Sequence, residues 1–588
     1  MGNSQANQTE QGMEKYFFRA SAADFKKIPG SPVAYWLSDA IISSFEKGNL
    51  ISDHCATRKG MATGLNAVFV RAWHEVSIKG IGFNLSRTEA ENSCLRWFPY
   101  ANGGEYRKWY GNFDDIVNWE NDGHRLQTEE HESGRIRAVN LNLDFIFKPG
   151  LSWTSITSGA FSIRKLPKGF LFSSASNAMF CEGDSSLYAG LLNSKAHVIL
   201  GKAINPTLNA NPGDIGKIPL PDTSIDVSKI IDSITAHSQR DWDSYEVSWD
   251  FTSLPLLHPD HRQPTLKASY QKLRADWREM MLDMQRLEQE NNRIFIDAYG
   301  LQDELTPEVR LSEITLTCNP HYRYGGDKSD EELEAMLLAD TMRELVSYAV
   351  GCMLGRYSLD KPGLILANQG ETLADYLAQV PQPSFPADDD NVIPVLDDDW
   401  FADDITLRFR QFLRVAFGEE HYEDNLAFIE QALNIKGKRN YSLRDYFLGE
   451  FYADHVKRYK KRPIYWLFSS PKGSFNALIY MHRYRPDTVS VVLKYLRDYR
   501  EKLVTEKERQ ASVSINPATS QGDKTRALKD VDRLAKVLAE LEDYERDVLY
   551  PLATEQIAID LDDGVKVNYR KFGSALKKII GLDAKEED

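Results

Sequence analysis

Apolar residues recur at alternating spacings of four and three between residues 266 and 287, and this pattern constrains the fold more than any other. The seam consists of Leu266, Tyr270, Leu273, Trp277, Met280, Met284 and Leu287. Such spacing places every member on one face of a long α-helix, as in a coiled coil. Stripes of this kind usually pack in a core rather than bind a ligand. The sequence therefore predicts a long, half-buried helix here.

The rest of the chain divides into a β-rich part and a helical part. Between residues 51 and 222, apolar runs such as NAVFVRAWHEV and NLNLDFIF lie between Gly, Ser and Asn breaks, which indicates short strands. After residue 222 the apolar spacing becomes helical. The predicted fold class is α+β, with a mixed α/β domain followed by a largely helical C-terminal region that contains long coiled-coil-like helices.

We expect four consecutive segments along the 588 residues. They are a lead-in with one short helix (1–50), the mixed α/β domain (51–222), a helical domain with the apolar seam (223–385), and a C-terminal helical domain (386–588). The last segment should hold a basic cluster and a final long helix from about residue 524 to about residue 550. A Pro- and Asp-rich stretch, residues 380–404, is expected to be a solvated linker, because it lacks the glycine turn of an EF-hand loop.

The cysteines and the apolar runs of the sequence indicate where in the cell the protein is located. Five cysteines, Cys55, Cys94, Cys181, Cys318 and Cys352, are far apart and form no CxxC pair. Zinc ribbons and a disulfide framework are therefore not expected, and a reducing cytoplasm is the simplest location. No apolar run reaches the roughly 18 residues that a membrane helix needs, and the first twenty residues do not have the pattern of a signal peptide.

Charge is segregated along the chain. The formal net charge of −15 argues against a protein that coats nucleic acid indiscriminately. Residues 53–168 nevertheless carry fifteen Lys and Arg against thirteen Asp and Glu, and residues 455–485 carry eight Lys and Arg with no acid. A local anion-binding face requires such segregation.

Catalytic motifs are missing from the sequence. There is no GxxxxGK[ST] loop, no GxGxxG after a strand, no HExxH and no GxSxG. TCNPHYRY, residues 317–324, partly resembles the Asn-Pro-Pro-Tyr loop of enzymes that methylate flipped bases, but His321 stands where the second Pro belongs. We expect an ordinary turn there, with no catalytic residue, metal ligand or cofactor-binding residue in this chain.

Four stretches combine cations, amides or hydroxyls with aromatic residues, which favours binding to DNA. Lys and Arg contact phosphates, whereas Arg and Asn also make bidentate contacts to base edges. In the first stretch, residues 58–66, glycines are expected to let the backbone approach DNA closely. The candidate residues are Arg58, Lys59, Thr63, Asn66, Arg71, Arg107, Lys108, Tyr110, Asn112, Ser155, Ser158, Arg164, Lys165, Lys457, Arg458, Lys460, Lys461 and Arg462. Alternatively, the aromatics belong to a core and the charge runs form solvated faces.

Several segments resemble a known family when they are taken in order. RKGMATGLNAVFVR, RKWYGNFDDIVNWENDG, WTSITSGAFSIRKLPKGFLF, YAGLLNSKAHVIL and NPTLNANPGDIGKIPLP resemble the target-recognition region of large adenine-specific DNA methyltransferases. NNRIFIDAYGLQDELTP and KRPIYWLFSSPKGSFNALIYMHRYRPDTV resemble the PglX methyltransferases of bacteriophage exclusion (BREX) systems. The resemblance covers nearly the whole chain after about residue 13.

That resemblance implies a division of labour. Members of the family carry an N-terminal methyltransferase domain with an S-adenosylmethionine loop and an Asn-Pro-Pro-Tyr loop, neither of which is present here. We therefore expect this chain to correspond to the C-terminal half. The implied partners are double-stranded DNA, a separate methyltransferase half and other BREX subunits, with S-adenosylmethionine bound only by the missing half and no membrane contact.

Three functions stay open at this stage. The first is sequence-specific DNA recognition for an adenine-N6 methyltransferase. The second is a protein-interaction scaffold, in which the helical region docks other defence subunits or phage inhibitors. The third is a complete enzyme with an unrecognised site.

Overall fold

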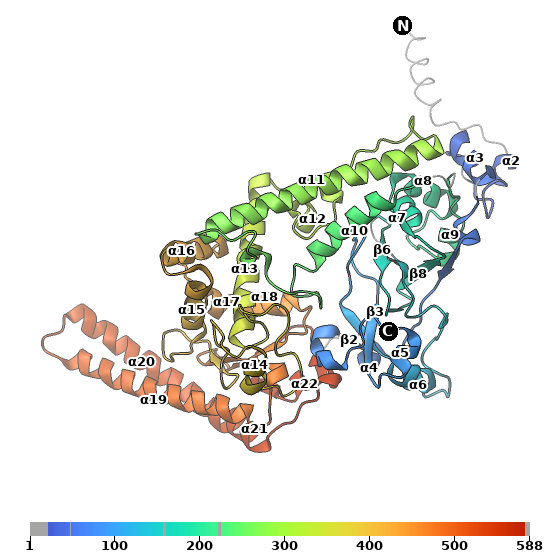
Figure 1. Ribbon diagram of the computed structural model, residues 1–588. Helices are drawn as coiled ribbons and strands as arrows, with labels where there is room; N and C mark the ends of the chain where they lie inside the picture. The colour runs from blue at the N-terminus through green and yellow to red at the C-terminus, as the bar shows by residue number, and fades with distance from the viewer. Residues whose placement is uncertain (1–21, 34, 48, 157–159, 222–224, 583–588) are drawn as a thin grey trace, which may run out of the picture. The chain divides into compact units, whose positions relative to one another are not determined.

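The computed structural model describes residues 22–33, 35–47, 49–156, 160–221 and 225–582 (Figure 1). The chain forms two compact units: unit 1 comprises residues 1–65, 82–242 and 277–325, and unit 2 comprises residues 66–81, 243–276 and 326–588. Helix accounts for 49% and strand for 11%, so the expected α+β class is confirmed. Each unit combines segments that the sequence analysis placed in different domains.

Unit 1 is built on two sheets. The first has the strand order β1-β8-β5-β6, with all pairs antiparallel, and consists of β1 (Cys55–Arg58), β8 (Ser176–Cys181), β5 (Gly150–Thr154) and β6 (Ile163–Leu166). In the second, β3 (Trp97–Ala101) pairs antiparallel with β4 (Asp115–Asn118) and parallel with β7 (Leu171–Phe172). Strands β3, β5 and β8 are largely buried. Of the two apolar runs that predicted strands, NLNLDFIF forms turns, and NAVFVRAWHEV contains the short helix Asn66–Phe69 before the three-residue strand Val70–Ala72.

Short helices surround these sheets. They include α2 (Ala22–Phe25), α3 (Asp39–Lys47), α5 (Arg87–Glu91), α6 (Glu120–Thr128), α7 (Ser186–Leu192), α8 (Lys195–Ile204), α9 (Pro212–Gly216), α10 (Ser228–Trp242) and α12 (Pro320–Arg323). Side-chain hydrogen bonds cap the N-termini of some of these helices. Ser86 and Glu89 form a reciprocal capping box at α5, and Ser194 accepts from the His197 amide at α8.

One cysteine pair departs from the expectation drawn from the sequence. Cys55 and Cys181 face each other in the register of β1 and β8, with their Cα atoms 4.2 Å apart, and form a disulfide. The two residues are 126 positions apart in the sequence, so their spacing gives no hint of the pairing. The expectation that the cysteines form no structural disulfide is therefore wrong for this pair, while Cys94, Cys318 and Cys352, all within the described residues, keep their thiols outside any disulfide.

Unit 2 is mainly helical, as expected. Its helices include α4 (Asn66–Phe69), α13 (Asp330–Met353), α14 (Leu373–Gln379), α15 (Ile405–Phe417), α16 (Tyr422–Leu433), α17 (Leu443–Gly449), α18 (Phe451–Arg458), α19 (Thr488–Ile515), α20 (Gln521–Tyr544), α21 (Tyr550–Glu555) and α22 (Val565–Arg570). It also contains β2 (Val70–Ala72) and a small antiparallel sheet of order β10-β11-β9, from β10 (Tyr465–Ser469), β11 (Asn476–Tyr480) and β9 (Ile393–Pro394). This small sheet lies in a segment that the sequence analysis expected to be helical.

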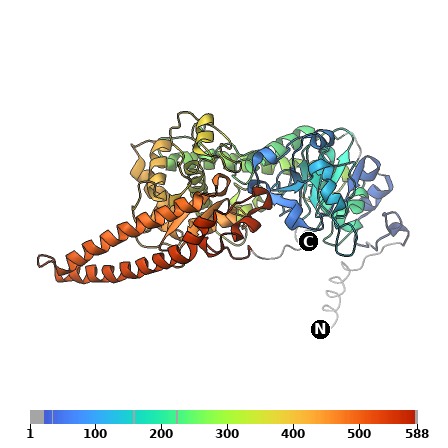
Figure 2. The same ribbon diagram turned by 90° about the horizontal axis from the view of Figure 1, so that it is seen from below.

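The long helices follow the predicted apolar spacing. Helix α11 (Leu266–Tyr299) is continuous in Figure 1, and all seven seam residues are buried in it. Its first residues belong to unit 2 and the rest, from residue 277, to unit 1. Helices α19 and α20 pack side by side as a hairpin, visible in Figures 1 and 2. The predicted last helix is confirmed as α20, which continues through a π-helical turn into α21.

Residues 380–404 are not the solvated linker that the sequence analysis expected. Val392 and Asp404 are fully buried, and β9 lies within the small sheet of unit 2. The Asp404 carboxylate accepts from the Thr406 amide at the start of α15 and lies 3.0 Å from an Arg444 nitrogen. The aspartates of this stretch suggested a solvated segment, but they lie among buried apolar residues, and Asp404 caps α15. None of the helices in the described ranges is both long and apolar enough to cross a membrane.

Candidate nucleic-acid interface

Arg107 is held inside unit 1 by a buried carboxylate. Its side chain is 4% exposed, and one guanidinium nitrogen lies 2.8 Å from the carboxylate of Asp241. Its remaining nitrogens donate to the Tyr110 carbonyl at 2.8 Å and to the Thr317 hydroxyl at 2.9 Å. Because the guanidinium already has buried partners, it is not available to a phosphate or base. We reassign Arg107 from a DNA contact to a structural residue.

Lys108 is likewise held inside unit 1 by a buried carboxylate. Its ammonium forms a buried ion pair with Glu288 on α11, and the indole nitrogen of Trp109 donates to the same carboxylate at 2.7 Å. Burial lowers the pKa of Lys108, but the charge and hydrogen bond of Glu288, together with Tyr106 and Glu313, hold that pKa above its ordinary value. Trp109 is therefore a core residue. Lys108 is better explained as a structural cation than as a DNA contact.

Arg164 and Arg71 are also buried, each within its own unit. Arg164 is 2% exposed and donates to the Arg107 carbonyl at 3.2 Å, and burial together with the Arg107 charge lowers its pKa to about 10. Arg71, in unit 2, is 7% exposed and donates to the carbonyls of Ala67 at 2.8 Å and Asp562 at 3.1 Å. We reassign both as structural residues, because phosphate contact requires exposure.

The uncharged candidates mostly serve local turns. Tyr110 and Thr63 are buried. The Asn112 amide donates to the Glu105 carbonyl at 2.8 Å, and the Ser155 hydroxyl donates to the Ser174 carbonyl at 2.8 Å. Asn66, half-buried, begins α4. Ser158 lies outside the described residues.

The glycines of residues 58–66, the glycine loop, are required by the protein's own packing. A Cβ atom on Gly60 would lie 2.2 Å from the Phe172 carbonyl oxygen. Gly64 has a φ of +66°, and a Cβ atom there would lie 2.4 Å from the Arg137 carbonyl oxygen. The backbone approaches its own chain here, so packing within unit 1 accounts for these glycines, and their approach to DNA stays a prediction.

Several cations nevertheless lie beside the glycine loop, in a part of the chain that also carries the exposed acids Glu130, Glu132 and Asp144. The Arg58 guanidinium lies 4.6 Å and the Lys148 ammonium 5.3 Å from the Phe145 ring centre. The Asn142 amide donates to the Lys59 carbonyl at 2.8 Å, and the Ala62 amide donates to the Val139 carbonyl at 3.0 Å. These contacts hold residues 129–148 against the loop.

We call this surface the glycine-loop face, formed by Arg58, Lys59, Arg135, Arg137 and Lys148. Lys59, Arg135 and Lys148 are exposed, and the two other arginines are half-buried. Within the described ranges, none of the five makes an ion pair. Arg58 and Lys59 are among the DNA-binding candidates predicted from the sequence. Arg135, Arg137 and Lys148, which lie in the run GRIRAVNLNLDFIFK, are not. Lys165, also exposed, lies 3.7 Å from Asp232.

The basic cluster of unit 2 is divided between structure and surface. Arg462 lies 3.0 Å from the buried Glu75 carboxylate. Burial lowers the pKa of Arg458, but the charges of Glu246 and Glu344 hold it above its ordinary value. The exposed members are Lys457, Lys460 and Lys461. Arg458 and Arg462 are therefore better explained as structural cations than as phosphate contacts.

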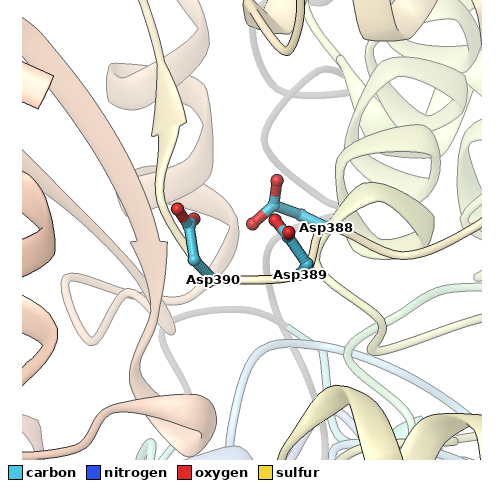
Figure 3. A group of neighbouring side chains, drawn as sticks. All are labelled: Asp388, Asp389 and Asp390. Atoms are coloured by element: carbon cyan, nitrogen blue, oxygen red, sulfur yellow. The ribbon is translucent and has the colours of Figure 1, made fainter.

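Three consecutive carboxylates form a separate cluster in unit 2. Asp388, Asp389 and Asp390 lie on one turn, with ligand oxygens within 4.8 Å of one another (Figure 3). The Val392 amide donates to both Asp388 and Asp390, and Arg483 donates to the Asp388 carbonyl at 2.8 Å. Burial and the neighbouring Asp390 charge raise the pKa of Asp388 to about 8. The cluster is explained by the turn that leads into β9.

The chain is similar in sequence to two adenine-specific methyltransferases. No family model matches the chain. It is 38% identical over 579 residues to the adenine-specific methyltransferase BrxX of Escherichia coli O9:H4 (strain HS), covering 95% of this chain and 46% of that protein. It is 37% identical over 589 residues to the adenine-specific methyltransferase PglX of Lacticaseibacillus casei (strain Zhang), covering 96% of this chain and 46% of that protein.

The expected resemblance to PglX-type adenine-specific methyltransferases is therefore confirmed. Nearly all of this chain is homologous to part of proteins named adenine-specific methyltransferases. The chain spans about half the length of the curated relatives it matches, at 46% in both cases.

Proposed function

We propose that this chain is the DNA-recognition part of an adenine-N6 DNA methyltransferase of a BREX defence system, and that it corresponds to the C-terminal half of such an enzyme. The observation that carries the proposal is the glycine-loop face, where five cations without ion pairs in the described ranges gather on a surface of unit 1. The likeness to adenine-specific methyltransferases supports it. A cytoplasmic location stays a prediction.

The proposed face would position a duplex rather than perform chemistry. Lys and Arg side chains neutralise phosphates and release bound counterions, and such contacts fix the orientation of the protein on DNA. The Arg58 guanidinium is already oriented by the Phe145 ring. Exposed residues beside it, such as Lys59 and Lys148, extend the same positive surface.

The loop that partly resembles a methyltransferase motif supports a catalytic half outside this sequence. Asn319 is fully buried. Its amide nitrogen donates to the carbonyls of Leu311 at 2.7 Å and Ile314 at 2.8 Å, and its oxygen accepts from the His321 amide at 3.1 Å. An amide committed to its own backbone cannot also hold the exocyclic nitrogen of adenine. We propose that S-adenosylmethionine is bound by the other half.

Reconstitution tests this proposal. The chain is assayed for methyl transfer from labelled S-adenosylmethionine to duplex DNA, alone and with the N-terminal half of a relative supplied as a separate or fused polypeptide. We expect no incorporation by either half alone and incorporation at adenine by the pair. Methyl transfer by this chain alone would contradict the proposal, as would an N-terminal half that methylates the same sites without it.

A further inference from the structure

The exposed lysines of the basic cluster line a cleft that lies entirely within unit 2. The cleft has a volume of about 940 Å³ and is bounded by α17, α18, the turn between β10 and β11, the neighbouring parts of α19 and α20, and residues 577–580. We call it the lysine cleft. Its size is in the range of pockets that enclose several side chains of a ligand.

The charged residues that line this cleft are mostly cations. Six lysines line it: Lys457, Lys460, Lys461, Lys472, Lys577 and Lys578. In the part of the chain that the structure describes, all of these except Lys460 are without an ion-pair partner. The carboxylate in the lining belongs to Asp397, which lies 3.8 Å from Arg533. Like charges gathered in a concave site repel one another, so an anionic occupant would be stabilised there.

The walls between the lysines are apolar. Val456, Leu467, Leu503, Val537 and Ile579 all line the cleft. At its rim, Ile580 is 86% exposed and Leu448 is 44% exposed. Large apolar side chains left in water at the edge of a concave site are typical of a surface that a partner covers. A surface for phosphates alone would gain nothing from them.

We infer that the lysine cleft receives a short acidic, amphipathic segment of a partner protein. Apolar side chains of that segment pack between Val456 and Ile579, and its carboxylates meet the surrounding lysines. This is the helix-in-groove mode of recognition, in which apolar anchors repeat on one face of the bound segment. The charge of the cleft selects an acidic segment over a basic or neutral one.

This inference is independent of the proposed function. The glycine-loop face belongs to unit 1 and the lysine cleft to unit 2, so variants of one surface leave the residues of the other unchanged. It also removes Lys457, Lys460 and Lys461 from the set of expected phosphate contacts. Duplex DNA is accordingly the competing occupant that the test must distinguish.

The test measures fluorescence anisotropy of the full chain with a labelled series of designed peptides. The series carries leucines at helical spacing and glutamates on the opposite face; controls are scrambled peptides of equal composition, versions with lysine for glutamate, and a labelled duplex. We expect the acidic amphipathic series to bind. Scrambling should weaken binding about tenfold, since the apolar face is lost, and the lysine versions should not bind.

Two sets of variants locate the binding. Ile580→Ser with Leu448→Ser should weaken binding of the peptide about tenfold, because both side chains lie in the cleft lining and are exposed in the unbound chain, at 86% and 44%. Lys577→Gln with Lys578→Gln should weaken it about fivefold, at exposed ion pairs. The matched control is Lys529→Gln with Lys536→Gln, two exposed lysines of α20 outside the cleft lining.

Three results would overturn the inference. The first is absence of binding across the peptide series at about 100 μM, an affinity of roughly −5 to −6 kcal/mol. The second is equal binding of amphipathic and scrambled peptides with no effect of the apolar variants, which would leave only non-specific charge. The third is tighter binding of duplex DNA than of any peptide, with that binding weakened by the lysine variants and not by the apolar variants. This result would make the cleft a phosphate-binding surface.

Discussion

The guanidinium of Arg107 and the carboxylate of Asp241 form an ion pair at 2.8 Å, and neither side chain is more than 4% exposed. Asp241 lies near the end of α10 and also accepts from the backbone amides of Thr317 and Cys318, at 2.6 Å and 2.9 Å. The pair therefore joins three segments of unit 1 that are far apart in sequence. It shows how a cation that looked like a DNA contact is instead used to hold the fold.

Arg107→Ala should destabilise unit 1. Removing one partner of a buried ion pair leaves the other charge without compensation, which typically costs about 3–5 kcal/mol of unfolding free energy. Urea denaturation measures the loss, with Arg135→Ala as an exposed control that should change stability by less than about 0.5 kcal/mol. Unchanged stability of the Arg107 variant, together with lost sequence preference on DNA, would restore Arg107 as a base contact.

Gly60→Ala should also destabilise, because the new Cβ would lie 2.2 Å from a backbone oxygen of Phe172. Overpacking against backbone typically costs about 1–3 kcal/mol. Gly213→Ala is the matched control, since nothing lies within 4 Å of its Cβ position. Thermal unfolding of both variants measures the difference. Equal midpoints would show that the glycine loop is free to move away from β7.

Asp388→Asn should stabilise the protein in a pH-dependent way. The folded pKa of Asp388 is raised to about 8, above the usual value of 3.8, so ionisation opposes folding. Its contribution is favourable below about pH 4 and is lost as pH rises toward about 8. The variant should therefore match the parent at the acidic end and exceed it in unfolding midpoint at pH 8.

Asp532→Asn, at an exposed position of α20, is the control for general charge effects. A gain that is the same at every pH, or equal in the two variants, would contradict an elevated pKa at Asp388.

The cross-strand disulfide gives a chemical prediction. Under non-reducing conditions Cys55 and Cys181 should resist alkylation after unfolding, leaving three reactive thiols from Cys94, Cys318 and Cys352. Reduction should lower stability by roughly 2–4 kcal/mol, because the bond closes a long loop in the unfolded chain. Mass spectrometry of alkylated protein counts the thiols. Five modified cysteines without reductant would contradict the pairing.

Regular apolar spacing in the sequence predicted the long helices. The seam from Leu266 to Leu287 and the last long helix are set by local apolar spacing, and both are present as predicted. Pairings between residues that are distant in sequence could not be predicted, because the local sequence does not show that Cys55 pairs with Cys181 or Arg107 with Asp241.

The candidate site shows the same limit. A run of cations beside aromatics does not reveal which cations have buried acids as partners, so Arg107, Lys108 and Arg164 looked the same as Lys59. Glu288, which neutralises Lys108, lies 180 residues further along the chain. Exposure, rather than composition, separates the glycine-loop face from these structural cations.

The most direct measurement of the central claim is the salt dependence of duplex DNA binding by this chain. The logarithm of the binding constant should fall linearly with the logarithm of salt concentration. In the variant Lys59→Ala, Arg135→Ala, Lys148→Ala, the slope should fall by roughly one per lost phosphate contact, and affinity should drop in step. Lys202→Ala, an exposed lysine on α8, should leave the slope within about one unit of the parent. Identical slopes for the triple variant and the parent, or no DNA binding by the parent at low salt, would contradict the account.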